Sequence, residues 1–225
     1  MNILDAIPVV LEREEAAQRL GLPSQGPRGE LLDGALTRAR ELIQPRACFR
    51  TSYVYEKGED TVKVGSVTFK SRILRVNLEK ADKVFPYVIT LGDGLDRAGE
   101  AAADMLQKYY LDQLGNLALG QAQEYLLTHL REKYGLGKVS RMNPGSLTDW
   151  PLEEQQQLFA LLGPEEVRDS LGVSLTSSFL MRPMKSVSGI VFPTEKTFKS
   201  CQLCPREDCP GRQAPYNEKL LKDYS

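Results

Sequence analysis

The chain has 225 residues, of which 26% are charged and 41% are hydrophobic, and its formal net charge at pH 7 is −1. This length and apolar content allow one large domain, or a domain with an appendage, to fold around a core without disulfides. Because basic and acidic residues are interspersed, no basic face is expected to neutralise a run of phosphates, which argues against nucleic acid as a partner.

The sequence also argues against a membrane partner. No apolar run approaches the ~20 residues of a membrane span. Residues 1–5 lack the basic start and the apolar stretch of a secretory signal. We therefore expect a cytoplasmic protein.

The first 46 residues are predicted to be a helical segment. Residues 12–20 are amphipathic, and residues 31–43 place apolar side chains at helical spacing before Pro45 ends the pattern. From residue 48 to 78 the pattern changes to β-branched and aromatic residues, which predicts two or three antiparallel strands.

Residues 84–91 predict a further strand, and the Gly-Asp-Gly of residues 92–94 that follows is interpreted as a tight turn without a ligand. Residues 95–134 repeat apolar side chains every three or four positions, which predicts one long helix or two. Gly115 and Gly120 would either kink this region or allow close packing. His129 is interpreted as a solvated or partly buried side chain. Because it is the only histidine in the sequence, a histidine-rich zinc site is excluded.

After residues 141–146, Arg-Met-Asn-Pro-Gly-Ser, a helix is predicted with Asp149 as its N-cap and its end near Leu162. Residues 177–182 and 186–192 then predict two strands. Strands followed by a long helical middle and a last strand pair predict an α+β fold, in which helices pack on a twisted antiparallel sheet.

Two separated segments resemble the activation, or reactivation, domain family of cobalamin-dependent methionine synthase. Residues 141–162, RMNPGSLTDWPLEEQQQLFALL, are similar to the family's R-x-x-x-G-Y segment and the helix after it. Residues 175–192, LTSSFLMRPMKSVSGIVF, are similar to its apolar strand, Met-x-Pro and Val-Ser-Gly run. A weaker similarity near residues 121–127 extends the resemblance to roughly residues 85–198. The chain resembles a stand-alone form of this domain with a C-terminal cysteine motif.

The resemblance implies an S-adenosylmethionine site at Arg141, Met142, Pro144, Gly145 and Ser146, with no catalytic residue. The ligand presents a carboxylate, a sulfonium and an adenine. Arg141 can offer the carboxylate a bidentate fork. Pro144 and Gly145 provide a constrained turn without a side chain in the way.

Three positions depart from the family pattern. Ser146 stands where the family has a tyrosine. The family's acidic residue on the long helix falls near Gly120, with Glu124 one turn away, and residues 197–198, Thr-Phe, occupy the region of its later tyrosine. These departures predict a ligand that is held more weakly or differently.

Cys201, Cys204 and Cys209 form a C-x-x-C-x4-C pattern, which is typical of soft-metal ligation. A fourth coordination position would be left for Cys48, water, a ligand or a partner. An iron–sulfur cluster is favoured because reactivation of an oxidised cobalt needs an electron. Zinc and three unligated thiols are the alternatives. The tail arginines are interpreted as solvated; they are Arg206 and Arg212.

These patterns divide the chain into a helical segment (residues 1–46), an activation-domain-like α+β domain (residues 47–198) and a cysteine-rich metal-binding tail (residues 199–225). The resemblance implies S-adenosylmethionine binding and reductive reactivation of a separate corrinoid protein or cobalamin-dependent methyltransferase, because the chain has no D-x-H-x-x-G corrinoid segment. The chain would be an accessory to that methyltransferase, and an electron donor is a further candidate partner. The alternatives are a non-catalytic binding module with a structural zinc tail and an iron–sulfur electron-transfer protein.

Overall fold

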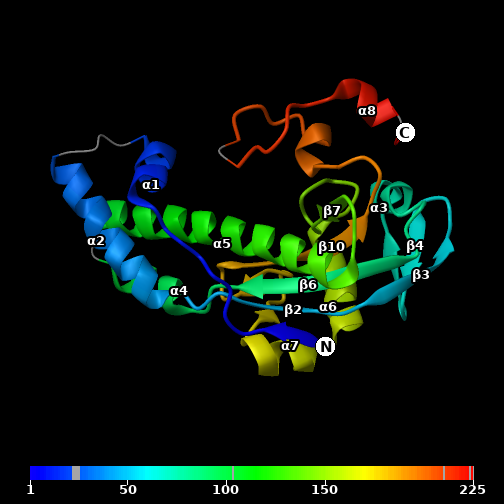
Figure 1. Cartoon of the computed structure of the whole chain (residues 1–225), viewed down its shortest axis with the longest axis horizontal. Helices are drawn as coiled ribbons and strands as arrows, with labels where there is room; N and C mark the ends of the chain where they lie inside the picture. Colours follow the sequence, from blue (N-terminus) through cyan, green and yellow to red (C-terminus); the bar gives the residue numbers. More distant parts are fainter. Residues whose placement is uncertain (22–25, 103, 210, 223, 225) are drawn as a thin grey trace.

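An antiparallel sheet forms the centre of the molecule (Figure 1). The computed structural model describes residues 1–21, 26–102, 104–209, 211–222 and 224. The central strand β6 pairs with β2 and β3 on one side and with β10 on the other. The main-sheet strands are β1 (Asn2–Leu4), β2 (Arg46–Phe49), β3 (Ser52–Lys57), β4 (Thr61–Val64), β5 (Val67–Lys70), β6 (Lys83–Thr90), β7 (Val139–Met142) and β10 (Ser186–Pro193).

Helices cover both faces of this sheet, so the predicted α+β class is confirmed. The region predicted as one or two helices, residues 95–134, forms two. The helices are α1 (Arg13–Leu20), α2 (Pro27–Leu42), α3 (Arg72–Asn77), α4 (Gly94–Ala101), α5 (Met105–Tyr134), α6 (Gln155–Leu162), α7 (Pro164–Leu171) and α8 (Glu218–Lys222), with 3-10 turns η1 (Leu152–Glu154) and η2 (Ser200–Leu203).

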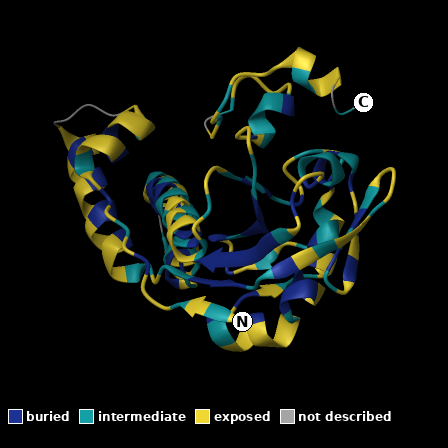
Figure 2. Cartoon of the chain, turned by 45° about the vertical axis from the view of Figure 1, so that its right-hand side comes forward, coloured by how far each residue is buried: buried dark blue, intermediate teal, exposed yellow. Residues whose placement is uncertain are grey.

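Alternate side chains of β6 enter two different parts of the core because successive strand residues point to opposite faces. Phe85, Tyr87 and Ile89 pack with the inner face of α5. Val84 and Val88 pack with α6 and α7 on the other face. Figure 2 shows this buried sheet between exposed helix surfaces. Gly115 permits the close packing of α5, since a Cβ there would lie 2.9 Å from the Leu95 side chain.

The two ends of the chain pack against the same sheet and helices. In the N-terminal segment β1 pairs with β2, and α1 and α2 share an apolar cluster with α5. In the tail, Leu203 is buried in the core, and the Tyr224 hydroxyl donates to Asn77 Oδ1 at 3.1 Å. The division into three segments remains a prediction, with the outer two segments in contact with the middle one.

Two elements were not predicted: the strand β1 within the helical segment and the helix α3 within residues 48–78. Two local predictions were also wrong. Asp149 does not cap the helix that follows it; its Oδ2 accepts from the Ile73 N–H at 3.0 Å and from the Ser71 hydroxyl, so it stabilises the start of α3. The strand expected at residues 177–182 is reduced to β9 (Met181–Arg182), which pairs with β8 (Ser174–Leu175). Both differences depend on contacts between distant segments, which a local pattern does not contain.

His129 is partly buried, as the sequence predicted, with its ring 5.9 Å from Phe49 and 6.4 Å from Tyr125 between centroids. In the described part of the chain, no helix combines the length and the apolar character needed to cross a membrane.

Candidate ligand-binding site

Arg141 lies in β7 at the wall of a cavity of about 560 Å³. Its register partner in β10 is Val191, and its side chain points to the α5 face of the sheet. Only 14% of that side chain is exposed. The adjacent Met142 points to the opposite face and is buried in the core. Because successive strand residues point to opposite faces of the sheet, the Arg141 side chain lines the cavity and the Met142 side chain does not.

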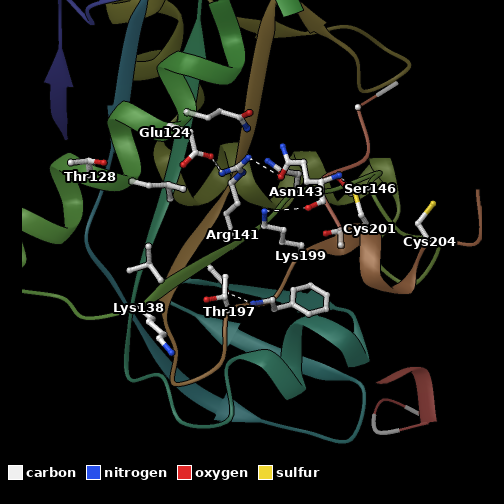
Figure 3. Close-up of a pocket in the computed structure, with 18 of the residues that line it drawn as sticks. Glu124, Thr128, Lys138, Arg141, Asn143, Ser146, Thr197, Lys199, Cys201 and Cys204 are labelled. Atoms are coloured by element: carbon white, nitrogen blue, oxygen red, sulfur yellow. Dashed lines mark hydrogen bonds and ion pairs between the residues drawn. The ribbon is translucent and has the colours of Figure 1, made fainter. Parts of the chain in front are cut away.

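The Arg141 guanidinium has partners from two distant segments (Figure 3). Its Nη1 donates to Glu124 Oε1 of α5 at 2.9 Å, and its Nη2 donates to Gln213 Oε1 of the tail at 3.4 Å. Glu124 is mostly exposed, so the pair lies at the border between the cavity and solvent. An arginine has five N–H donors, and further donors therefore remain for a ligand.

A buried polar network fixes the strand end beneath this pair. Asn143 Nδ2 donates to the Tyr87 hydroxyl at 2.8 Å and to the Ser188 carbonyl. Burial raises the pKa of Tyr87, so its hydroxyl stays neutral, although the positive charge of Arg141 acts in the opposite direction. Gly189 leaves room for this network, since a Cβ there would lie 2.6 Å from Asn143 Nδ2 and 3.0 Å from the Tyr87 hydroxyl.

The turn after β7 requires the predicted glycine. Gly145 has φ +82°, a left-handed conformation that residues with a Cβ rarely adopt. Its N–H donates to the carbonyl of the buried Trp150 at 2.8 Å. The turn separates the first cavity from a second one of about 530 Å³, beside the exposed side chains of Leu180 and Met184.

Four of the five predicted ligand residues line one or both of these cavities, and Met142 lines neither. Arg141 and Ser146 line the first cavity, whereas Pro144, Gly145 and again Ser146 line the second. Met142 could offer a ligand only backbone atoms. Whether these residues bind the ligand remains a prediction.

Sequence reasoning missed several residues that shape the first cavity. Asn143 lies inside the segment that was singled out, but its role depends on Tyr87, which the apolar pattern of β6 does not distinguish from core residues. Glu124 was noted one turn from the family's acidic position, and the structure pairs it with Arg141. Nothing in the sequence indicated Gln213, which lies 72 positions from its partner.

The three tail cysteines also line the first cavity. We call residues 201–209 and 211–214 the cysteine loop. Figure 3 shows Cys201 and Cys204 on the η2 side of the cavity, with Arg141 opposite. Among the described residues, no three His, Cys, Asp or Glu side chains lie together in a way that could hold a metal ion. The structure therefore gives no support to the predicted iron–sulfur or zinc centre at Cys201, Cys204 and Cys209.

A different group organises this loop. Arg212, interpreted from the sequence as solvated, is partly buried and donates to backbone carbonyls of the cysteine loop, including those of Cys201 at 3.1 Å and Cys204 at 3.0 Å. The interpretation was wrong because the carbonyls that surround the guanidinium come together only when the loop is folded.

Cys48 does not line the cavity. It lies in β2, is fully buried in the core, and burial raises the pKa of its thiol to about 12. Because Cys48 is buried in the core and does not line the cavity that the three tail cysteines line, its position disfavours it as their fourth ligand.

The charges that line the first cavity favour an anionic group. Among the described residues that line it, one, Glu124, carries a carboxylate and four carry a cation: Arg131, Lys138, Arg141 and Lys199. Arg141 is the least exposed of these four residues, and its guanidinium donates a hydrogen bond to the carboxylate of Glu124. A ligand carboxylate at this position would lie among positive charges, which stabilises it.

An antiparallel α+β domain with a cavity of this size against a half-buried arginine is typical of a small-molecule-binding domain. The family model described as "Vitamin B12 dependent methionine synthase, activation domain" matches residues 57–203, more than half of the chain. The chain therefore belongs to this family, as the resemblance of its motifs indicated.

A solved structure has a similar fold. The crystal structure of the MetH reactivation domain bound to AdoHcy is 18% identical to this chain, with a TM-score of 0.57. The alignment covers 88% of this chain and 80% of that chain. At this identity the similarity establishes the fold. A comparison with curated protein sequences gave no match.

Proposed function

We propose that this chain binds S-adenosylmethionine at the cavity beside Arg141 and supports the reductive reactivation of a separate corrinoid protein or cobalamin-dependent methyltransferase. Membership of the activation domain family supports the reaction class. The related MetH domain was solved with AdoHcy, the product that remains when S-adenosylmethionine gives up its methyl group.

The observation that carries the proposal is the pairing of Arg141 with Glu124 at 2.9 Å on the wall of a cavity of about 560 Å³. Ligand pockets of roughly 300–1,000 Å³ suit small molecules of this size class. The amino-acid end of S-adenosylmethionine is a zwitterion. Its carboxylate matches the donors of Arg141, and its ammonium group matches the carboxylate of Glu124.

The partner supplies the cobalt centre, which takes up one electron from a reductant and then the methyl group, leaving AdoHcy. This chain's part is to hold the methyl donor and orient its sulfonium toward the partner. Methyl transfer needs the reacting atoms in line at about 3–3.5 Å. The exposed Ser146, on the turn between the two cavities, marks the side from which the partner's corrinoid would approach. We place this reaction in the cytoplasm.

Calorimetry with AdoHcy and with S-adenosylmethionine tests the binding step. Arg141→Ala should weaken binding by about 1.5–3 kcal/mol, because a charge-assisted hydrogen bond to a partly buried carboxylate is lost. The matched control is Arg168→Ala, which removes an exposed arginine that pairs with its neighbour Asp169 on α7. No binding to the wild-type protein, or equal binding to the Arg141 variant and the control, would refute this site.

An anaerobic assay tests the reactivation step. The protein is mixed with candidate corrinoid proteins from the same cell, S-adenosylmethionine and a reductant, and the cobalt spectrum is followed. We expect the return to the methylated state to be faster with the protein present. Reactivation at an equal rate without the protein, combined with intact ligand binding, would favour the non-catalytic binding module.

Metal analysis of the anaerobically purified protein separates the hypotheses for the tail. Stoichiometric iron with visible absorption would support an iron–sulfur centre, and loss of reactivation in a Cys204→Ser variant that still binds ligand would then place the tail on the electron path. Stoichiometric zinc would support a structural clip. Absence of both metals would leave three free thiols in a loop that Arg212 organises.

A further inference from the structure

The cysteine loop forms one side of the cavity whose other side carries Arg141. Cys201, Cys204, Cys209 and Gln213 all line this cavity. Only residues 201–203 of the loop fall within the span that the family model matches, which ends at residue 203. Most of this side of the cavity therefore lies beyond the region that defines the family.

The guanidinium of Arg212 holds the loop through its backbone. It donates five hydrogen bonds, one for each of its N–H groups. The acceptors are the carbonyl oxygens of Glu207 at 3.3 Å from Nε, Cys201 at 3.1 Å and Ala214 at 2.9 Å from Nη1, and Cys204 at 3.0 Å and Arg206 from Nη2. One planar cation thus gathers carbonyls from both ends and the middle of the loop.

The loop is joined to the cavity beside this cation. Gln213, the next residue, accepts from Arg141 Nη2 through its side chain at 3.4 Å. Its N–H donates to Cys201 Sγ at 3.4 Å, and its carbonyl accepts from Lys199 Nζ at 3.3 Å. The position of Gln213 relative to Arg141 therefore depends on the shape that Arg212 gives the loop.

We propose that Arg212 is a positioning residue of the ligand cavity: it holds the cysteine loop closed as the wall opposite Arg141, and this wall raises the affinity for the ligand. The second half of the inference rests on the proposed function. No ligand atom is required to contact Arg212. Lysine cannot replace it, because an ammonium group has three donors around one point and cannot reach five carbonyls spread around a planar fork.

The expected size of the effect follows from the fraction of molecules in which the wall is closed. The apparent affinity falls in proportion to the binding-competent fraction, so a loop that is closed one tenth of the time binds about tenfold more weakly. The sheet side of the cavity, with Arg141, Asn143 and Tyr87, keeps its own hydrogen bonds when the loop opens. The thermal midpoint of unfolding should therefore stay close to that of the wild-type protein.

The test compares Arg212→Ala, Arg212→Lys and the wild-type chain, with Arg206→Ala as the matched control. Arg206 lies in the same loop with an exposed side chain, and the bond that it contributes to the Arg212 network comes from its carbonyl, which the substitution keeps. Labelling with a thiol reagent, resolved by peptide mass spectrometry, reports loop opening without any ligand. Cys48 is the internal control, because it is fully buried and should stay unlabelled while the domain is folded.

In both Arg212 variants we expect Cys201, Cys204 and Cys209 to be labelled several-fold faster and AdoHcy to bind about tenfold more weakly by calorimetry. Arg206→Ala should change neither value, and AdoHcy should slow the labelling of Cys201 in the wild-type protein. Unchanged labelling in the Arg212 variants would overturn the positioning role. Faster labelling with unchanged AdoHcy affinity would show that the loop is not a wall for the ligand.

Two further outcomes are distinguishable from these. If the wild-type protein does not bind AdoHcy, the proposed function and the affinity effect both fail, whereas the labelling rates still decide whether Arg212 orders the loop. Stoichiometric metal that is bound by the three thiols and retained in Arg212→Ala, with slow labelling, would show that a metal orders the loop in place of Arg212.

Discussion

The two sides of the cavity are built in different ways. The sheet side is formed by β6, β7 and β10. There Asn143 and Tyr87 are joined by a hydrogen bond, Gly189 leaves space for both, and core side chains pack beside Tyr87. Apart from the buried Leu203, the loop side consists of partly buried or exposed residues, and it depends on the backbone bonds of Arg212. Figure 2 shows the same contrast between the buried sheet and the mostly exposed tail.

This difference predicts different responses to substitution. On the sheet side an added atom or a lost hydroxyl acts on the close-packed core, so the free energy of unfolding should change. On the loop side a lost side chain acts on a surface segment, so local opening should change while the fold persists. Three of the four substitutions below test this comparison, and the one at Cys48 tests the core of the same sheet; the largest expected effect comes first.

Gly189→Ala should destabilise the protein by about 3 kcal/mol, because overpacking a site without free space forces the backbone or its neighbours to move. The added Cβ would meet Asn143 Nδ2 at 2.6 Å and the Tyr87 hydroxyl at 3.0 Å. Denaturant unfolding measures the change. The control is Gly120→Ala in α5, where a Cβ meets nothing within 4 Å. This control should be neutral or stabilise the helix by up to about 1 kcal/mol. Equal stability of the two variants would contradict the overpacked sheet side.

Cys48→Val should remove part of the loss of stability at alkaline pH. Burial raises the pKa of Cys48 from 9.0 to about 12, so above pH 9 unfolding releases a proton that the folded state retains. This thiol therefore favours the folded state most below pH 9, and its contribution falls by up to about 1.4 kcal/mol per pH unit between pH 9 and 12. Urea unfolding at pH 8, 9 and 10 measures the slope. Identical slopes for the variant and the wild-type protein would show that Cys48 is not held neutral by burial.

Tyr87→Phe should cost about 1 kcal/mol of unfolding free energy, because a partly buried amide hydrogen of Asn143 loses its acceptor while the ring packing is kept. The bond that is lost is 2.8 Å long. Tyr55→Phe is the matched control, since Tyr55 is 66% exposed. A variant at position 87 that unfolds at the same denaturant concentration as this control would show that the network does not stabilise the sheet side.

Gln213→Ala should change the unfolding free energy by less than about 0.5 kcal/mol, as expected for an exposed side chain with one long hydrogen bond. Thiol labelling of the cysteine loop should stay at the wild-type rate, because the Arg212 bonds to the loop carbonyls remain. A clear loss of global stability would erase the distinction between the two sides of the cavity.

The sequence by itself determined the local parts of this protein. Helical and strand periodicities placed most elements, and their order along the chain predicted the α+β class. The Arg-Met-Asn-Pro-Gly-Ser segment predicted Arg141 as the cation of the site and a turn after it. Gly145 in this turn has a left-handed φ of +82°. These features were accessible because they depend on neighbouring residues, through strand alternation and the steric freedom of glycine.

Only the tertiary structure decided which side chains meet. Asp149 bonds to the start of α3 and not to its own helix, and Arg141 meets Glu124 of α5 and Gln213 of the tail. Arg212 became the centre of the cysteine loop for the same reason. A hydrogen bond requires two groups at about 3 Å, and whether residues far apart in sequence reach that distance is set by the packing of elements against one another, which no local pattern encodes.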